Sequence, residues 1–277
     1  FRSSLEKVAG FDKRRTLPSY AKTPFYKWFN ENEKGFLKSD KKVVLFADTY
    51  LNYHEPEIGK DALKLLNDCG YEVILANVGC CQRPKISHGF IRDAKEAGYS
   101  TVSSLVDFIN QGLKIVVCEP SCASALNDDF PDLLTDEELA LKLKENVLMI
   151  DVFLYREMSN GELDVKIRAK DGKMHVHGHC HQMALYGTEA MKRTLADQEE
   201  FEEIPSGCCG MAGSFGYEKE HYELSEKIGD EILFPSLKDL PTKASIAACG
   251  FSCRHQIDHF TGLKAKHWVS CVEVIKS

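Results

Sequence analysis

The stretch Gly207-Cys-Cys-Gly-Met-Ala-Gly-Ser-Phe-Gly216 decides the organisation of the chain, because its adjacent cysteines have an earlier counterpart in Cys80-Cys81. A nearly constant offset between repeated features indicates an internal duplication. Cys180 of the second copy projects back to the region of Asp48, so the first copy is expected to place a carboxylate where the second has a thiol. The offset is 128 positions from Cys80 to Cys208, and 131 from Cys118 to Cys249 and from Cys122 to Cys253.

The composition excludes several classes of protein. The chain has 277 residues, of which 43% are hydrophobic, enough for one large or two modest cores. A net charge of −7 argues against binding nucleic acid through phosphate neutralisation. The longest apolar run, Val147–Tyr155, is interrupted by Asp151 and is far shorter than the about 18 residues of a membrane span. Because the chain opens at Phe1 without a signal-peptide pattern, we expect a fragment or a processed piece of a cytoplasmic protein.

The 11 cysteines favour metal binding or redox chemistry over a disulfide scaffold, which would be shorter and denser in cysteine. Cys69 and Cys271 lie in an amphipathic helical stretch and a strand-like run, respectively, so both are interpreted as buried structural thiols. The other nine follow the repeat.

Each copy reads as alternating short strands and helices, which predicts an α/β fold with parallel sheets covered by helices. We expect a strap over residues 1–40, a first repeat over 41–160 and a second over 161–277. The predicted strands are Val43–Ala47, Glu72–Ala76, Lys114–Val117, Lys173–His177 and Ala244–Ala248. The predicted helices are Ile58–Asp68, Ile86–Ala97, Val102–Gln111, a capped helix from Thr135 to Asn146, Ala184–Ala196 and Tyr217–Leu233.

The repeated cysteines and Asp48 each come just after a predicted strand, so they should meet at the carboxyl edge of each sheet. Clustered thiolates suit zinc or an iron–sulfur cluster. The adjacent Cys208 and Cys209 fit one tetrahedral ion poorly, whereas each can bind a different iron of a cluster. A buried vicinal pair or a regulatory disulfide is the alternative.

The residues around the second pair have predicted supporting roles. The glycine-rich loop with Gly210 and Gly213 is expected to enter a helix and to aim backbone N–H groups at sulfides. Four alternating histidines, if they continue one strand, share one face and offer a zinc site. The preferred interpretation gives His179 and His181 hydrogen-bonding roles around Cys180. The four histidines are His175, His177, His179 and His181.

Three second-copy motifs resemble the CCG-type cysteine-rich repeat, and more narrowly the C-terminal iron–sulfur region of FAD-linked D-2-hydroxy-acid dehydrogenases, which act on D-lactate, D-2-hydroxyglutarate or glycolate. The motifs are His177-Gly-His-Cys-His-Gln182, Gly207-Cys-Cys-Gly-Met-Ala-Gly-Ser-Phe-Gly-Tyr-Glu218 and Gly250-Phe-Ser-Cys-Arg-His-Gln256. The first-copy segments Phe46–Tyr53, Cys80–Pro84 and Glu119–Cys122 resemble the family's first repeat, and Arg14–Ala21 resembles the linker that enters it. The resemblance spans about residues 11–270.

The resemblance implies two tandem, pseudo-duplicated Rossmann-like CCG domains that hold a 4Fe–4S cluster or a noncubane relative. Its pattern assigns Cys180, Cys208, Cys209 and Cys253 as ligands in the second copy, and Cys80, Cys81 and Cys122 with Asp48 in the first. Carboxylate ligation is poor for such a centre, so the second copy is the stronger candidate. Cys118 and Cys249 lie outside the pattern and are either fifth ligands, as in the noncubane clusters of heterodisulfide reductase B subunits, or bystanders.

In the relatives a flavin domain oxidises the substrate and a ferredoxin-like iron–sulfur segment precedes the repeats, and neither motif occurs in this sequence. The resemblance therefore implies an electron-transfer portion that takes electrons from FAD in another domain or subunit and passes them to a quinone or cytochrome. No residue of this chain is expected to be catalytic. A location in the cytoplasm or peripherally on the inner membrane follows. The alternatives are thiol–disulfide reduction at a cluster and a zinc-stabilised docking module.

The segment Arg14–Phe29 interleaves basic and aromatic residues, as nucleic-acid-binding strips do. The chain as a whole is acidic, and Pro18 and Pro24 punctuate the segment. We therefore expect a strap that docks onto the body of the protein.

Overall fold

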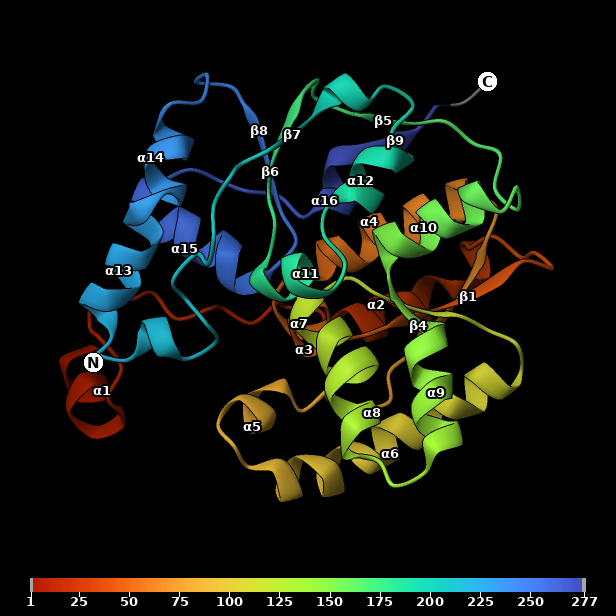
Figure 1. Ribbon diagram of the computed structural model, residues 1–277, viewed down its shortest axis with the longest axis horizontal. Helices are drawn as coiled ribbons and strands as arrows, with labels where there is room; N and C mark the ends of the chain where they lie inside the picture. Colours follow the sequence, from red (N-terminus) through yellow and green to blue (C-terminus); the bar gives the residue numbers. More distant parts are fainter. Residues whose placement is uncertain (1, 276–277) are drawn as a thin grey trace.

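The computed structural model describes residues 2–275 and contains two parallel sheets (Figure 1). The first has strand order β2-β1-β3-β4 and the second β7-β6-β8, with a short antiparallel pair, β5-β9, beside them. Parallel pairing holds throughout the two main sheets, so the predicted α/β fold class is confirmed.

The strands are β1 (Lys42–Phe46), β2 (Glu72–Ala76), β3 (Ile115–Val117), β4 (Val147–Met149), β5 (Ile167–Ala169), β6 (Met174–His177), β7 (Phe201–Glu203), β8 (Ser245–Ala248) and β9 (Val272–Val274). The helices are α1 (Arg2–Ala9), α2 (Phe25–Asn32), α3 (Thr49–Tyr53), α4 (Pro56–Asp68), α5 (Arg83–Ser87), α6 (Ile91–Asn110), α7 (Pro120–Ser124), α8 (Phe130–Leu133), α9 (Glu137–Asn146), α10 (Ile150–Ser159), α11 (Cys180–Leu185), α12 (Glu189–Thr194), α13 (Tyr222–Glu231), α14 (Leu233–Lys238), α15 (Phe251–Thr261) and α16 (Trp268–Cys271).

The predicted strands agree with the structure to within one residue at each end, because their apolar runs are buried by helices. In β1 every residue after Lys42 is buried, as expected for a central parallel strand with both faces covered. Residues 42–46 pair in register with 72–76 of β2, and β3 pairs with the other edge of β1. The carboxyl ends of the strands in each sheet therefore lie along one edge.

Several predicted helices have other bounds or caps in the structure. The two helices expected over residues 86–111 are one long helix, α6, preceded by the short α5. Gly98 lies inside α6, and a Cβ there would lie 2.0 Å from the Phe130 ring, so the close approach of this ring requires glycine. The cap of α9 is Asp136, which accepts a hydrogen bond from the Leu139 amide at 3.0 Å, and not Thr135.

Two further corrections concern the second copy. The helix expected over residues 184–196 is the pair α11 and α12, separated by Gly187 with its positive φ of 68°. The long helix expected from residue 217 begins at Tyr222. Cys271 ends helix α16 and does not lie in a strand, although it is buried as predicted, and so is Cys69.

The C-terminal segment ties the two copies together. Helix α16 packs on α4 of the first copy, and β9 pairs with β5. The fully buried Trp268 belongs to the hydrophobic cluster that packs around the first sheet. A second, smaller cluster lies under α14 and α15. The core of the first copy is therefore completed by residues from the end of the chain.

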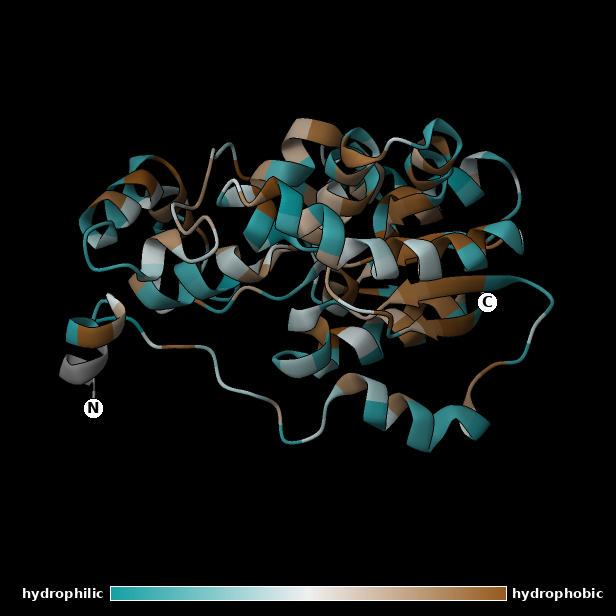
Figure 2. Cartoon of the chain, turned by 90° about the horizontal axis from the view of Figure 1, so that it is seen from below, coloured by the Kyte–Doolittle hydropathy of each residue, from teal (hydrophilic) through white to brown (hydrophobic). Residues whose placement is uncertain are grey.

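The strap crosses from the second copy to the first. In Figure 2 it runs along the body between α1 and α2. At one end, Arg15 donates from Nε to the Gly216 carbonyl at 2.6 Å. At the other end, Phe25 is fully buried in the first copy and Ala21 donates its amide to the Tyr53 carbonyl at 2.7 Å. Arg15 and Phe25 thus dock the strap onto the body, whereas Tyr20 between them is exposed.

Candidate functional site

The second-copy site gathers four cysteines from three segments that follow strands. Cys180 is the first residue of α11 after β6, Cys208 and Cys209 lie in the loop after β7, and Cys253 is in α15 after β8. The thiols form a connected chain of hydrogen-bonded contacts, from Cys180 to Cys208, then Cys209, then Cys253. Contact with Cys180 and Cys209 lowers the pKa of Cys208 and favours a thiolate there.

His177 belongs to this site, although its individual role was not predicted from the sequence. One ligand atom each of His177, Cys209 and Cys253 lie within 4.8 Å of one another, and all three residues are buried. The imidazole is held by a 2.7 Å hydrogen bond between Nδ1 and the Ser206 hydroxyl. Its Nε2 is buried and has no hydrogen-bond partner among residues 2–275. The place of His177 at the last residue of β6 is a signal that could have identified it.

Gly210 contacts the thiol of Cys208 through its backbone. Its amide donates to Sγ of Cys208 at 3.3 Å, which requires a positive φ of 91°. A Cβ at this position would lie 2.2 Å from the Ser225 carbonyl oxygen. Gly213 shapes the following turn, with a φ of 66° and open space at its Cβ position. Since α13 begins only at Tyr222, the loop does not lead directly into a helix N-terminus.

The predicted four-histidine face does not form, because β6 ends at His177. His179 is the N-cap of α11, and its Nδ1 accepts the His181 amide at 3.2 Å. The two rings stack with centroids 5.5 Å apart. Burial lowers the pKa of His181 to about 4, so this ring stays neutral, and its Nδ1 lies 3.1 Å from the Ser124 hydroxyl of the first copy.

The first-copy site repeats the arrangement with three thiols. Cys80 and Cys81 follow β2, and Cys122 lies in α7 after β3. Sγ of Cys81 is 2.9 Å from Sγ of Cys122, and Cys80 makes a hydrogen-bonded contact with Cys81. The Gln82 amide donates to Sγ of Cys80 at 3.4 Å, and Gln82 has a positive φ of 56°. The Gly210 amide donates to Sγ of Cys208 in the same way in the second copy. The backbone turn around the vicinal pair is thus the same in both copies.

Thr49, not Asp48, occupies the position that corresponds to Cys180. Asp48 caps α3 two residues after β1, as His179 caps α11 two residues after β6. Thr49 makes a hydrogen-bonded contact with Cys80, as Cys180 does with Cys208. The offset of 131 from Cys180 leads to residue 49 and carried this signal.

Asp48 nevertheless has one carboxylate oxygen to spare. Its Oδ1 accepts the amides of Tyr50 and Leu51 at 2.9 and 3.0 Å. Its Oδ2 is buried without a hydrogen-bond partner in the described part of the chain. Burial raises the pKa of Asp48 to about 7. An uncompensated buried carboxylate is costly unless a proton or a cation accompanies it.

Cys118 and Cys249 lie at equivalent places, directly after β3 and β8. Both are buried, and burial raises the pKa of each thiol. The charge of Cys249 also raises the pKa of Cys118, which places the two thiols near one another at the junction of the copies.

Buried polar contacts fix the two sites relative to each other. Oε2 of Glu119, beside Cys118, accepts the Phe251 amide at the start of α15 at 2.8 Å. Arg254 forms an ion pair with Glu55 of the first copy and donates to the carbonyls of Ala248 and Cys249. The Tyr50 and Phe251 rings stack at 4.0 Å.

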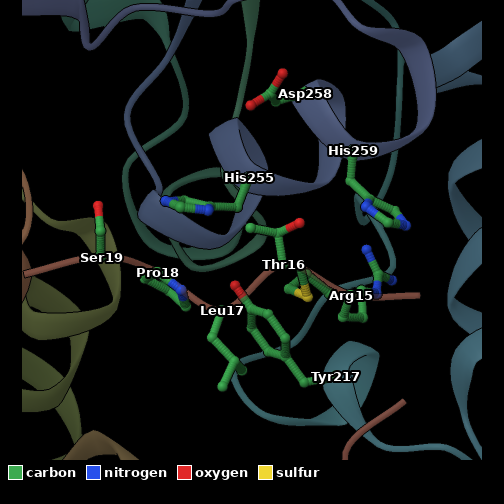
Figure 3. A pocket seen from close by; sticks show the side chains of 10 residues that line it. Arg15, Thr16, Leu17, Pro18, Ser19, Tyr217, His255, Asp258 and His259 are labelled. Atoms are coloured by element: carbon green, nitrogen blue, oxygen red, sulfur yellow. The ribbon is translucent and has the colours of Figure 1, made fainter. Parts of the chain in front are cut away.

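A pocket of about 320 Å³ lies between the strap and the second copy (Figure 3). Strap residues 15–19 form one wall. Tyr217, His255 and His259 lie around them, and His255 is two residues beyond Cys253. The Tyr217 hydroxyl and Nη1 of Arg15 are buried without partners in the described residues.

The donor chemistry of the second site fits an iron–sulfur cluster. Four convergent thiols provide soft ligands from three segments. The Gly210 amide and the orphaned Nε2 of His177 provide polar groups around the sulfurs. The first site fits in part, because it offers three thiols, the Thr49 hydroxyl and the spare oxygen of Asp48.

Comparison with known proteins supports this description. Residues 44–127 match the CCG cysteine-rich domain. A component of the anaerobic glycerol-3-phosphate dehydrogenase of Escherichia coli (strain K12) is 28% identical over 276 residues, covering 96% of this chain and 67% of that protein. D-2-hydroxyglutarate dehydrogenase of Pantoea ananatis (strain AJ13355) is 26% identical over 82% of this chain, but only 22% of that protein is covered. Lactate utilization protein A 1 of Bacillus mycoides (strain KBAB4) is 25% identical, with 69% of this chain and 78% of that protein covered.

Within residues 2–275, no helix has the length and apolar character needed to cross a membrane. The family match covers the first copy, and the second copy repeats its vicinal cysteines, its turn and its strand-end helices. Residues 44–127 thus match the CCG cysteine-rich domain, and the chain is similar to proteins that are named as dehydrogenases or their subunits.

Proposed function

We propose that this chain is the iron–sulfur electron-transfer part of a flavin-linked dehydrogenase. The observation that carries the proposal is the connected set of Cys180, Cys208, Cys209 and Cys253 at the carboxyl edge of one sheet. A thiolate-held iron–sulfur cluster supplies one-electron transfer over a potential range that its protein surroundings set. The two dehydrogenase relatives are consistent with a redox partner that oxidises the substrate elsewhere.

The residues around the thiols would hold the cluster and limit its exposure to water. Cys209 and Cys253 are buried, whereas Cys180 is exposed and Cys208 partly so. This arrangement leaves one side of the site open to an electron-transfer partner. The Gly210 amide would stabilise the thiolate of Cys208 by donating a hydrogen bond to it. No acid–base step is assigned to any residue of the chain.

For the first copy we propose a weaker or more labile centre. Cys80, Cys81 and Cys122 would be its thiolate ligands, with the spare oxygen of Asp48 as the fourth donor. Thr49 stands where the second copy has Cys180, so this site lacks one soft ligand. Cys118 and Cys249 are assigned no ligand role, because they lie near one another at the junction of the copies and outside the two sets of site thiols.

The proposed partners are a flavin-containing domain or subunit, a ferredoxin-like iron–sulfur segment and a quinone or cytochrome acceptor. A small acceptor is favoured by the pocket beside His255, which has room for a compact ring and carries the unpartnered Tyr217 hydroxyl. The relatives are named for glycerol-3-phosphate, D-2-hydroxyglutarate and lactate, so the substrate class we propose is a small hydroxylated acid or phosphate ester.

One observation favours a different function, a zinc-stabilised docking module. His177, Cys209 and Cys253 by themselves form a three-ligand set, which would need a fourth donor to complete a structural zinc site. The two proposals differ in what the purified protein contains.

The experiment is to measure iron, acid-labile sulfide and zinc in protein purified without oxygen, and to record EPR spectra before and after dithionite. About four irons and four sulfides per chain are expected for one occupied site, and about eight of each for two. Zinc without sulfide would contradict electron transfer and support the docking module. Disulfide reduction by the flavin-free protein would instead support a catalytic cluster.

A further inference from the structure

We infer that His177 is a positioning residue of the second site, which donates a hydrogen bond from Nε2 to the sulfurs of Cys209 and Cys253 and thereby raises the reduction potential of the centre held there. This inference rests on the proposed iron–sulfur function. It gives a role to a buried histidine that the ligand pattern leaves out.

The geometry limits what Nε2 of His177 can contact. His177 is 1% exposed, and its Nε2 has no oxygen or nitrogen partner among residues 2–275. The sulfurs of Cys209 and Cys253 are within 4.8 Å of the imidazole atom that faces them. The nearby imidazole of His177 is also among the causes that lower the pKa of Cys253, after the larger effect of its contact with Cys209. The sulfurs are therefore the acceptors available to this ring.

In this proposal the Ser206 hydroxyl is assigned as a donor to Nδ1 of His177, which fixes the tautomer. The hydroxyl lies 2.7 Å from Nδ1, a normal distance for a hydroxyl that donates to a ring nitrogen. When Nδ1 accepts this hydrogen bond, the neutral ring carries its proton on Nε2. An N–H directed at thiolates can donate to them but has no lone pair with which to ligate a metal. In the proposed cluster, four cysteines complete the ligand set without it.

The first copy provides an internal contrast. Phe46 is the last residue of β1 and stands two residues before the N-cap Asp48, as His177 stands two residues before the N-cap His179. Phe46 is fully buried and cannot donate a hydrogen bond. The second site therefore has an additional donor that the backbone repeat does not require.

A hydrogen bond to a cluster thiolate stabilises the reduced, more negatively charged state more than the oxidised state. Such bonds are among the main determinants of iron–sulfur reduction potentials. Removing the donor should lower the midpoint potential without changing the number of irons.

The test compares the wild-type chain with His177→Phe, which copies the first-copy residue, and with His177→Gln and Ser206→Ala. His175→Gln is the matched control, because His175 lies two residues earlier on β6, where its Nδ1 is 3.9 Å from Oε2 of Glu202. Iron and sulfide contents and EPR-monitored midpoint potentials are measured for each protein without oxygen.

We expect His177→Phe to keep its iron and to have a lower midpoint potential. His177→Gln should show a smaller decrease, since an amide can still donate, and Ser206→Ala should shift the potential in the same direction. The control should keep the wild-type value. If His177→Phe does not fold, the midpoint potentials of His177→Gln and Ser206→Ala test the inference.

Unchanged potentials in variants with full iron content would overturn the inference. So would loss of iron together with a new EPR signal, because that result identifies His177 as a ligand. Wild-type protein without iron and sulfide would overturn the proposed function instead, and it is detected before any variant is compared.

Discussion

The two copies share a backbone but differ in the side chains that the backbone presents. In both, a residue with positive φ, Gln82 or Gly210, returns its amide to the first sulfur of a vicinal cysteine pair. At the end of the central strand, however, Phe46 and Thr49 of the first copy stand where the second has His177 and Cys180. The comparison teaches that the fold fixes where a centre can lie, whereas a few side chains decide how well it is held.

The largest difference between the copies should follow from removing one vicinal cysteine. Cys209→Ala deletes the thiol that contacts both Cys208 and Cys253, so we expect loss of the second-copy centre with the fold retained. Cys81→Ala, the matched change in the first copy, should remove less iron because that site has fewer thiols. Iron, sulfide and the visible charge-transfer band provide the measurement.

The control for both variants is Cys69→Ala, a buried thiol at the end of α4, outside both sites. It should retain the wild-type iron content. Full iron and an unchanged visible band in Cys209→Ala would disprove the assignment of the second site.

Thr49→Cys should make the first site more similar to the second, because it completes a set of four thiols there. Because Thr49 already contacts Cys80, a thiol at this position is placed to act as a ligand. We expect more iron and sulfide per chain than in the wild type. Thr49→Ser, which keeps the hydroxyl, serves as the control and should show no gain. An equal iron content in all three proteins would argue against the correspondence of Thr49 with Cys180.

A third prediction concerns Asp151, which lies at the start of α10 and is fully buried. Burial raises its pKa from 3.8 to about 7, so the folded chain retains a proton that the unfolded chain releases between about pH 4 and pH 7. Stability is therefore lost as pH rises through this window. Asp151→Asn should increase the free energy of unfolding at pH 8 by roughly 2–4 kcal/mol and change it little at pH 4.

Urea denaturation at the two pH values tests this expectation. Asp132→Asn is a suitable control, since its carboxylate is exposed and pairs only with Lys144 at the surface among the described residues. An Asp151→Asn effect of the same size at both pH values would mean that packing, and not the carboxyl proton, is responsible.

The smallest expected effect concerns the junction of the copies. Glu119→Ala leaves the buried Phe251 amide without its 2.8 Å acceptor, and Gly250, the corresponding residue of the second copy, offers no equivalent group. We expect a loss of about 1–3 kcal/mol in the free energy of unfolding. Glu119→Gln keeps an acceptor oxygen and should lose less. Equal losses in the two variants would show that the negative charge, rather than the hydrogen bond, matters.

Much of the site could be predicted because it depends on local sequence. Strand ends follow from short apolar runs, and the carboxyl edge of a parallel sheet brings the residues after each run together. The pairing of Cys80-Cys81 with Cys208-Cys209 therefore pointed to two sites before any contact was known. His177 was missed as an individual member because the alternating pattern groups it with three other histidines, although its place at the end of a predicted strand could have identified it.

The sequence by itself determined the duplicated α/β fold, the paired cysteines and their place after the strands, since periodicity and repeat spacing are properties of neighbouring residues. The offsets of 128 to 131 place the counterpart of Cys180 only near residue 49. The tertiary structure assigned Thr49 to that position, because Thr49 and Cys180 each begin a helix, whereas Asp48 is a helix cap. It also decided that α16 completes the core of the first copy and that Glu119 caps a helix of the second. Such contacts join residues more than a hundred positions apart, and burial and hydrogen-bond satisfaction select them only once the chain has folded.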